Sequence, residues 1–407
     1  MSIYNQLKKL FKHSIVYGVG DALNRLAAFI LLPLYTRALK PEEFGALELI
    51  YMTASFLTLF MGRQLSHGSL RFYFEYDNPV EQKAVISSSY ITSLLFAGTC
   101  MAICAAYSEK FSLLVFSNNE YSICFNVIFL SIVLELANEI FFAYLRAKEF
   151  SISFISFSLA GLLVRLVMTI YLVAFAGWGI VGVLTGNLIG VGVVWIISFI
   201  YMITKIGLKF KLAIAKHVIR YVAPLILVGF SGMFIGMSDR FVLKSFSGLS
   251  IVGIYALGVR FKSVLSFLVI NPFTRAYGPF RFAIMKEKNA KEIYSKVTTY
   301  FCLLLFITGM GIAALSKEVI EIMSDKEYWE AYKIIPIMMF TGISQGMYYM
   351  FQIGNYIGKK TEANAKLFFA GAILNILFLL VLVKYFNAYG AAIAVMMTEW
   401  FIAIGGL

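Results

Sequence analysis

The 407-residue sequence is poor in charge: only 14% of its residues are Asp, Glu, Lys or Arg, whereas 60% are hydrophobic. Its mean hydropathy of +0.81 is far above that of soluble proteins, so a water-soluble globular domain is excluded. Only seven residues are proline, which allows long helices with few interruptions. The apolar runs are long enough to cross a bilayer, and the sequence therefore predicts an all-α polytopic membrane protein.

Cysteine and histidine are also scarce, with four and three residues respectively. Cys100 and Cys104 fall on one helix face, but no second pair or histidine completes a metal site. Ser/His/Asp constellations and phosphate-binding loops are missing from the sequence. We therefore expect no metal, no cofactor and no enzymatic activity.

Apolar runs separated by short polar turns predict about twelve membrane-spanning helices. Their approximate limits are 14–38, 46–70, 84–107, 121–145, 151–176, 179–203, 218–245, 251–274, 293–315, 332–357, 364–385 and 389–407. Well over half of the 35 Lys and Arg residues lie at the N-terminus and in every second connection after it, which predicts that both termini are cytoplasmic. The net charge of +13 fits an anionic membrane surface, and we expect no nucleic-acid partner.

The two halves of the chain carry similar short motifs in the same order. About 210 residues separate Phe44-Gly45 from Val252-Gly253, Ala160-Gly161 from Ala370-Gly371, and Gly179 from Gly390. This repeat predicts an N-terminal six-helix bundle (1–204), a basic cytoplasmic linker (205–217) and a C-terminal six-helix bundle (218–407). The same comparison predicts an end of the last helix beyond Leu407, so we expect either a short last helix or a truncated one.

Several arginines fall within the predicted spans, where an isolated charge costs roughly 2.5–3.5 kcal/mol. Arginine suits phosphate because it stays charged and offers a planar fork of donors. Arg25, Arg63 and Arg260 are therefore candidates for binding an anionic substrate, together with Asn24. Asn24 and Arg25 follow Asp21 by three and four residues, so the three project from one helix face.

Carboxylates within the spans allow two interpretations. Asp21, Glu135, Glu139, Asp239 and Glu399 could bind a coupling H⁺ or Na⁺ during transport. Alternatively, they neutralise fixed cations. Asp21 could neutralise Arg25, which lies one helical turn later. By helix depth, we expect Asp239 to meet Arg260 and Glu135 to meet Arg165, within about 4 Å or through one water.

The segment from Arg37 to Gly45, R-A-L-K-P-E-E-F-G, resembles the "R-x-L-x-P-x-E-[FY]-G" exit of the first helix in Wzx-type bacterial polysaccharide flippases. Gly68-Ser69-Leu70-Arg71-Phe72-Tyr73 and Gly390-Ala391-Ala392-Ile393-Ala394 also resemble motifs of that family, and the similarity covers nearly the whole chain. The family belongs to a superfamily that includes multidrug exporters and lipid II flippases. The resemblance implies a MATE-like fold of two lobes around a central cavity.

The same resemblance implies a function. The expected substrate is a polyprenyl-diphosphate-linked oligosaccharide, moved across the bacterial inner membrane by alternating access for O-antigen, lipopolysaccharide or other surface polysaccharide synthesis. Expected partners are this lipid-linked substrate, membrane lipids, and the polysaccharide polymerase and chain-length proteins. The alternatives are a MATE-type multidrug or small-molecule cation exporter and a non-transporting assembly factor. A cation exporter should have a surplus of carboxylates within its spans, but here basic and acidic residues are nearly balanced. If the two pairs expected by depth form, Arg25 and Arg63 remain as cations, which favours an anionic substrate.

Overall fold

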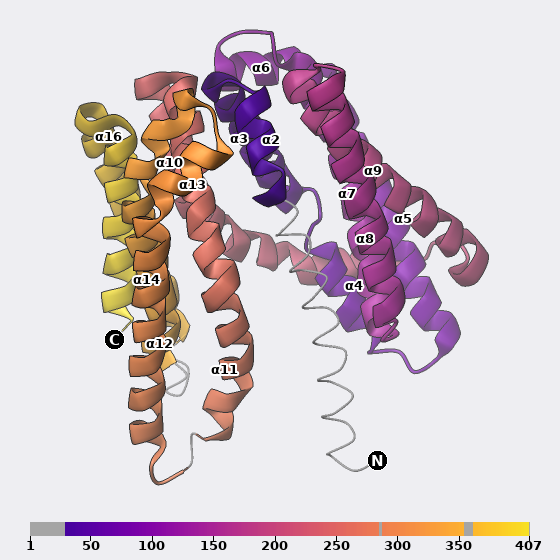
Figure 1. Cartoon of the computed structure of the whole chain (residues 1–407). Helices are drawn as coiled ribbons and strands as arrows, with labels where there is room; N and C mark the ends of the chain where they lie inside the picture. Colours follow the sequence, from indigo (N-terminus) through magenta and orange to yellow (C-terminus); the bar gives the residue numbers. More distant parts are fainter. Residues whose placement is uncertain (1–28, 285–286, 354–360, 407) are drawn as a thin grey trace. The chain divides into compact units, whose positions relative to one another are not determined.

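The computed structural model describes residues 29–284, 287–353 and 361–406, which are helical throughout apart from short connections (Figure 1). Eight helical segments of this described part are long and apolar enough to cross a membrane, judged by length and composition. The prediction of an all-α polytopic membrane protein is therefore confirmed. The α-helices are α2 (Leu32–Ala38), α3 (Pro41–Phe60), α4 (Leu65–Tyr73), α5 (Pro79–Ala106), α6 (Ser108–Phe116), α7 (Ser122–Ala147), α8 (Ser151–Ile170), α9 (Gly179–Tyr201), α10 (Leu212–Leu265), α11 (Asn271–Ala283), α12 (Ala290–Ala314), α13 (Ser316–Met323), α14 (Ile335–Phe351) and α16 (Thr361–Gly405).

Helix α10 contains two of the predicted spans, 218–245 and 251–274, because the chain reverses within it. Gly248 adopts φ +82°, a left-handed conformation that breaks the helix and that glycine reaches without steric cost. The hydroxyl of Tyr255 donates to the Asp239 carboxylate over 2.6 Å. In a straight helix these two residues would lie about 24 Å apart. The two arms of α10 therefore form a hairpin.

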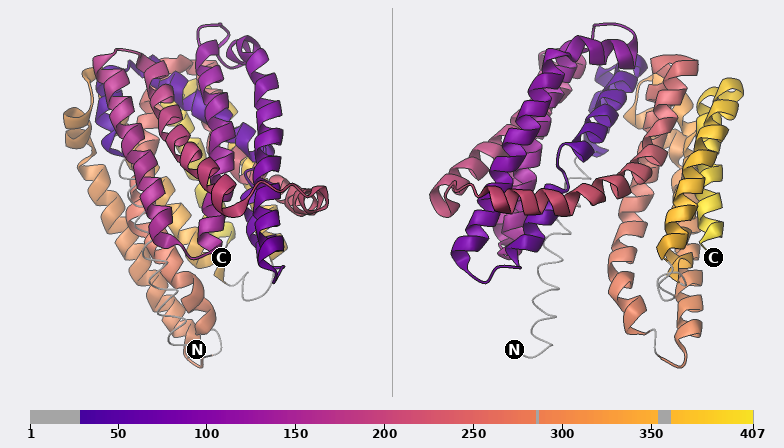
Figure 2. Two further views of the ribbon diagram at one scale, coloured as in Figure 1. Left: turned by 90° about the vertical axis from the view of Figure 1, so that its right-hand side faces the viewer. Right: turned by 180° about the vertical axis from the view of Figure 1, so that it is seen from behind.

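Helix α16 reverses in the same way and contains the predicted spans 364–385 and 389–407. Asn387 has φ +47° at the break, and the Thr398 hydroxyl reaches the Asn375 side-chain oxygen over 3.3 Å. A straight helix would separate these residues by roughly 35 Å. Figure 2 shows the two arms of α16 side by side. The predicted first span, 14–38, lies mostly outside the described residues.

The chain forms two compact units. Unit 1 contains Leu49–Phe230 and the residues up to Leu34, and unit 2 contains Tyr35–Glu48 and Ser231–Leu407. These units differ from the predicted boundaries at two places. The start of α3 belongs to unit 2, and the start of α10 belongs to unit 1, because Ile214, Val218 and Val222 bury one face of α10 in the unit 1 core.

The start of α3 packs against the α10 hairpin at a contact of glycines. A Cβ atom on Gly45 would fall on the carbonyl oxygen of Leu249 and 2.9 Å from the amide nitrogen of Gly253. A Cβ atom on Gly253 would in turn overlap the carbonyl group of Pro41. The two backbones touch here, as in close helix crossings within membranes. The sequence repeat between Phe44-Gly45 and Val252-Gly253 therefore corresponds to a contact in space.

Hydrogen bonds join the end of α2 and Leu39 to α13 and to the 3₁₀ helix η4 (Lys326–Lys333). Thr36 Oγ1 donates to the Met323 carbonyl over 3.0 Å, and Arg37 donates to the Ile322 carbonyl over 2.7 Å. The Tyr328 hydroxyl donates to the Leu39 carbonyl over 2.9 Å, and burial raises its pKa above the ordinary value. Tyr328 therefore stays protonated and can keep this bond at any physiological pH.

The glycine contact yields a stability prediction. Gly45→Ala should force the backbones of α3 and α10 apart and lower the free energy of unfolding by about 1–3 kcal/mol. Thermal unfolding of the detergent-purified protein measures the effect. Gly98→Ala is the matched control, because Gly98 is a helical glycine with no neighbour within 4 Å of its Cβ position. That control should be neutral or stabilising by up to about 1 kcal/mol, and equal melting temperatures for the two variants would contradict the prediction.

Candidate functional site

Close packing of α8 on α9 builds the first polar site, which lies within unit 1. Gly182, Gly186 and Gly190 recur every fourth residue along one face of α9. A Cβ atom on Gly190 would lie 2.7 Å from the Cβ of Arg165 and 2.8 Å from the Gly161 carbonyl oxygen. Only glycine allows this approach, which brings Arg165 of α8 next to Asn187 of α9.

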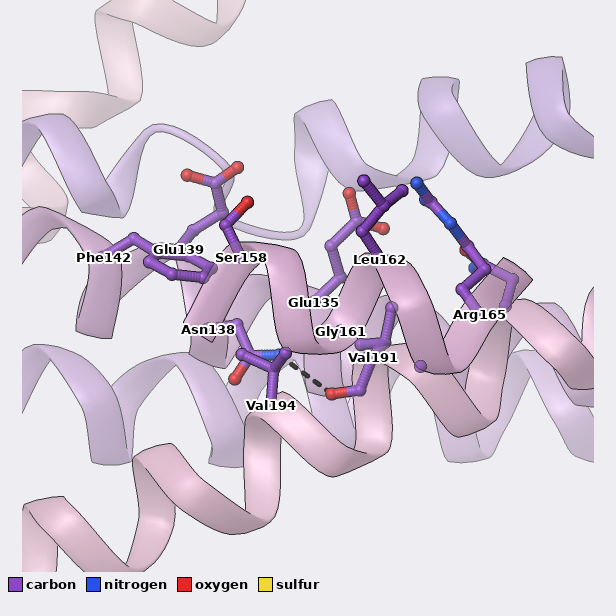
Figure 3. Close-up of a pocket in the computed structure, with 12 residues that line it drawn as sticks. Glu135, Asn138, Glu139, Phe142, Ser158, Gly161, Leu162, Arg165, Val191 and Val194 are labelled. Atoms are coloured by element: carbon purple, nitrogen blue, oxygen red, sulfur yellow. Dashed lines mark hydrogen bonds between the residues drawn. The ribbon is translucent and has the colours of Figure 1, made fainter. Parts of the chain in front are cut away.

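A pocket of about 250 Å³ opens between α7, α8 and α9. In Figure 3, Glu135, Asn138 and Glu139 project from α7 and Ser158 and Arg165 from α8. The pocket therefore has room for several water molecules or a hydrated ion.

Hydrogen bonds fix the wall of this pocket. Asn138 is buried, and its amide donates to the Val191 carbonyl over 3.1 Å, as Figure 3 shows. Ser198 Oγ donates to the Asn138 side-chain oxygen over 3.1 Å and lies 3.3 Å from the Tyr90 hydroxyl. With α7 and α9 joined in this way, the adjacent carboxylates of Glu135 and Glu139 are held at one wall.

The pocket has a near balance of opposite charges. Glu135 lies near the middle of α7, and the charges of Arg63, Glu139 and Arg165 act on its carboxylate. Glu135 and Arg165 were predicted to pair directly or through one water, and no direct ion pair within 4.0 Å joins these two described residues. The two side chains line a common cavity instead. The carboxylate can therefore exchange a proton or cation without first breaking a contact ion pair with Arg165.

Arg63 lies at a break in the predicted second span. The chain leaves α3 at Phe60 and re-enters a helix at Leu65, with Gly62 at φ +105° between them. The predicted span 46–70 corresponds to the candidate membrane span Pro41–Tyr73, which contains this break. The side chain of Arg63 is exposed there. Broken helices at membrane depth often expose groups that bind a substrate or ion.

Asp239 in unit 2 belongs to a buried cluster. Both of its carboxylate oxygens lie 3.0 Å from Arg240 Nη1, and Tyr255 donates to it over 2.6 Å. Asp239, Arg240 and Tyr255 are all nearly inaccessible to solvent. The predicted Asp239–Arg260 pair is therefore wrong. The chain reverses at Gly248, so Asp239 faces Tyr255 across the hairpin, and the adjacent Arg240 occupies its carboxylate.

Arg260 and Glu399 have other partners in unit 2. Arg260 Nε donates to Glu48 Oε1 over 3.1 Å, and its Nη2 contacts the same oxygen. The ammonium group of Lys262 lies 3.7 Å from the Glu399 carboxylate. Between the hairpins, Asn375 donates to Ser238 Oγ over 3.0 Å and accepts from Thr398. The contact of Glu48 with Arg260 thus joins a charged residue of the first half of the sequence to one of the second half.

Some residues of these sites were not among those selected from the sequence. Asn138 follows Glu135 by three residues and precedes Glu139 by one, so helical spacing places all three on one face. This pattern alone could have identified the α7 wall. Glu48 has no such signal, because its partner is 212 residues away. The candidate residues Asp21, Asn24 and Arg25 lie outside the described residues.

Long apolar helices that break or reverse at membrane depth, with charged clusters between them, are typical of a membrane transporter. The family model described as "Polysaccharide biosynthesis protein" matches residues 10–285, well over half of the sequence. The chain belongs to this polysaccharide biosynthesis family. The curated Lsg locus protein 1 of Haemophilus influenzae is 27% identical over 292 residues, which cover 69% of this chain and 68% of the relative.

Solved structures show the same fold. The lipid II flippase MurJ in an inward closed conformation matches with a TM-score of 0.79 and 15% identity, covering 97% of this chain and 87% of MurJ. A multidrug resistance MATE family transporter of the MOP superfamily, inward-facing, matches with 0.78 and 15% identity, covering 95% and 96%. The predicted MATE-like fold is confirmed. The chain has the fold of MOP-superfamily flippases and transporters.

The buried cluster yields a second prediction. Arg240→Ala should leave the Asp239 carboxylate without its cation and lower the free energy of unfolding by about 3–5 kcal/mol. Lys296→Ala, which breaks the exposed pair with Glu292, is the matched control and should cost less than about 1 kcal/mol. Unfolding of both variants in detergent measures the difference, and a similar small loss for both would show that the Asp239–Arg240 contact is not structural.

Proposed function

We propose that this protein flips a polyprenyl-diphosphate-linked oligosaccharide across the bacterial inner membrane for surface polysaccharide synthesis. Family membership and the fold shared with a lipid II flippase support a lipid-linked saccharide as the substrate. The proposed role is transport without a chemical step. Both termini are cytoplasmic in this proposal, and the polymerase and chain-length proteins act on the product.

The observation that carries the proposal is an accessible arginine within a candidate membrane span of each unit. Arg63 is exposed at the helix break of unit 1, and the Arg260 side chain in unit 2 is 39% exposed. A diphosphate that leaves water needs donors of comparable strength, and guanidinium groups can provide them bidentately. In this proposal, Arg63 and Arg260 bind the diphosphate, together with Arg25 and Asn24, which are assigned from the sequence.

The unit 1 pocket provides a site for a coupling ion. The Glu135 and Glu139 carboxylates line this pocket and can take up H⁺ or Na⁺. Asp239 and Glu399 are weaker candidates because Arg240 and Lys262 already neutralise them. Asp21 remains a coupling candidate from the sequence.

A cation exporter is the second candidate function, and the two pocket carboxylates together with the MATE fold favour it. The two functions differ in the sign of the charge that the substrate carries. Loss of the exposed arginines should abolish transport of an anionic lipid, but it should leave cation export unchanged or improve it.

The arginine assignment yields a third prediction. Arg63→Ala and Arg260→Ala should each abolish surface polysaccharide at normal protein levels, while the lysine variants should keep partial function because one charge without a planar fork remains. Complementation of a deletion strain, with immunoblots of protein and polysaccharide, measures the outcome. Lys317→Ala removes an exposed cation of α13 and should complement fully. Normal polysaccharide from a well-expressed Arg63→Ala/Arg260→Ala double variant would refute the assignment.

The coupling assignment yields a fourth prediction. Glu135→Gln keeps the size of the side chain but removes its charge, so lipid flipping in proteoliposomes should no longer respond to an imposed ion gradient. Separate proton and sodium gradients identify the ion. Glu120→Gln, at an exposed connection before α7, is the control and should keep the wild-type response. An unchanged gradient response in Glu135→Gln would remove this residue from the coupling site.

A further inference from the structure

Glu48 lies at a particular position in the chain. It is the last residue of the α3 segment that belongs to unit 2, and its helix continues from Leu49 into unit 1. Its side chain is only 7% exposed, whereas that of its partner Arg260 is 39% exposed. The acid is therefore enclosed by protein, and the guanidinium keeps an accessible side.

Two arginines act on Glu48. Arg260 contacts Oε1 through both Nε and Nη2, and the charge of Glu48 also acts on the buried Arg240. Arg240 is fixed by Asp239 and by the Gly236 carbonyl, so it cannot follow a ligand. Arg260 is the accessible partner of this carboxylate. Glu48 accepts from the Nε and Nη2 edge of the guanidinium, so an anion that binds bidentately at this edge competes with Glu48 for the same donors.

We propose that Glu48 is an internal counterion of Arg260 that a phosphate of the substrate displaces. This inference rests on the proposed function and adds a residue that sets affinity. Without substrate, Glu48 neutralises Arg260 and limits the cost of a charge at membrane depth. When a diphosphate binds, its oxygens replace the Glu48 carboxylate at the Arg260 guanidinium. The positive charge of the nearby Arg240 still attracts the released carboxylate and so limits the free-energy cost of this step.

The physical consequence is weaker but reversible substrate binding. An arginine without an internal counterion would hold a diphosphate strongly and release it slowly, because charge-assisted bidentate contacts are strong. A carboxylate that returns to the guanidinium favours release. Glu48 therefore lowers the affinity of Arg260 for the diphosphate and speeds release of the substrate. This effect requires both the negative charge of Glu48 and the presence of Arg260.

The test measures binding to the full-length protein in detergent. The probes are farnesyl diphosphate, inorganic diphosphate and uncharged farnesol, so that binding through the phosphate can be separated from binding through the lipid chain. Glu48→Gln, which keeps size and loses charge, should bind farnesyl diphosphate roughly three- to tenfold more tightly than wild type. Its flipping rate in proteoliposomes should fall, and farnesol binding should not change.

Two further variants serve as matched controls. Glu292→Gln removes the same charge from an exposed pair with Lys296 and should leave diphosphate affinity unchanged. In an Arg260→Ala background, Glu48→Gln should bring no gain in affinity, because the competing donors are gone. The double variant removes both charges of the pair, so it avoids an uncompensated buried carboxylate and its melting temperature reports correct folding.

The outcomes separate the two proposals. If wild type binds farnesyl diphosphate, Arg260→Ala does not, and folded Glu48→Gln binds no more tightly than wild type, the counterion role is overturned while the flippase proposal stands. If Glu48→Gln gains the same affinity in the presence and absence of Arg260, the counterion role is also overturned. If wild type binds neither diphosphate, both proposals are overturned.

Discussion

Each charge at membrane depth needs a partner within the protein, because hydrocarbon cannot solvate it. This constraint explains why the polar residues gather in a few clusters. In unit 2, Asp239 is neutralised by Arg240 and Arg260 by Glu48. In unit 1, opposite charges share a pocket that has room for water. The charges of unit 2 named here contact their partners directly, whereas Glu135 and Arg165 of unit 1 line a common pocket.

Reversals and close backbone contacts position these clusters. The hairpins of α10 and α16 bring residues that are far apart in the sequence to hydrogen-bonding distance, as Asp239 with Tyr255 and Asn375 with Thr398 show. Glycine allows the start of α3 to touch α10, and this contact places Glu48 beside Arg260. The small size of Gly45 thus allows Glu48 and Arg260 to meet, although glycine itself carries no charge.

The accessible arginines and the acidic pocket suit different tasks. In the proposed function, the guanidinium groups of Arg63 and Arg260 bind the diphosphate, while the pocket around Glu135 holds the coupling ion. A flippase that uses an ion gradient needs both kinds of site. The internal counterion Glu48 would add a third requirement of a transporter, since a substrate that binds must also be released.

The sequence alone determined that the chain is an all-α membrane protein, because hydropathy and helix length depend on local composition. The MATE-like fold was implied by the resemblance of its motifs to a known family. It also indicated the charged residues worth attention. Their partners could not be predicted by depth: Asp239 pairs with its neighbour Arg240, and Arg260 pairs with Glu48 from the other half of the sequence. Pairing depends on helix rotation and on contacts such as that of Gly45 with Gly253. These are properties of the packed chain, so only the tertiary structure decided them.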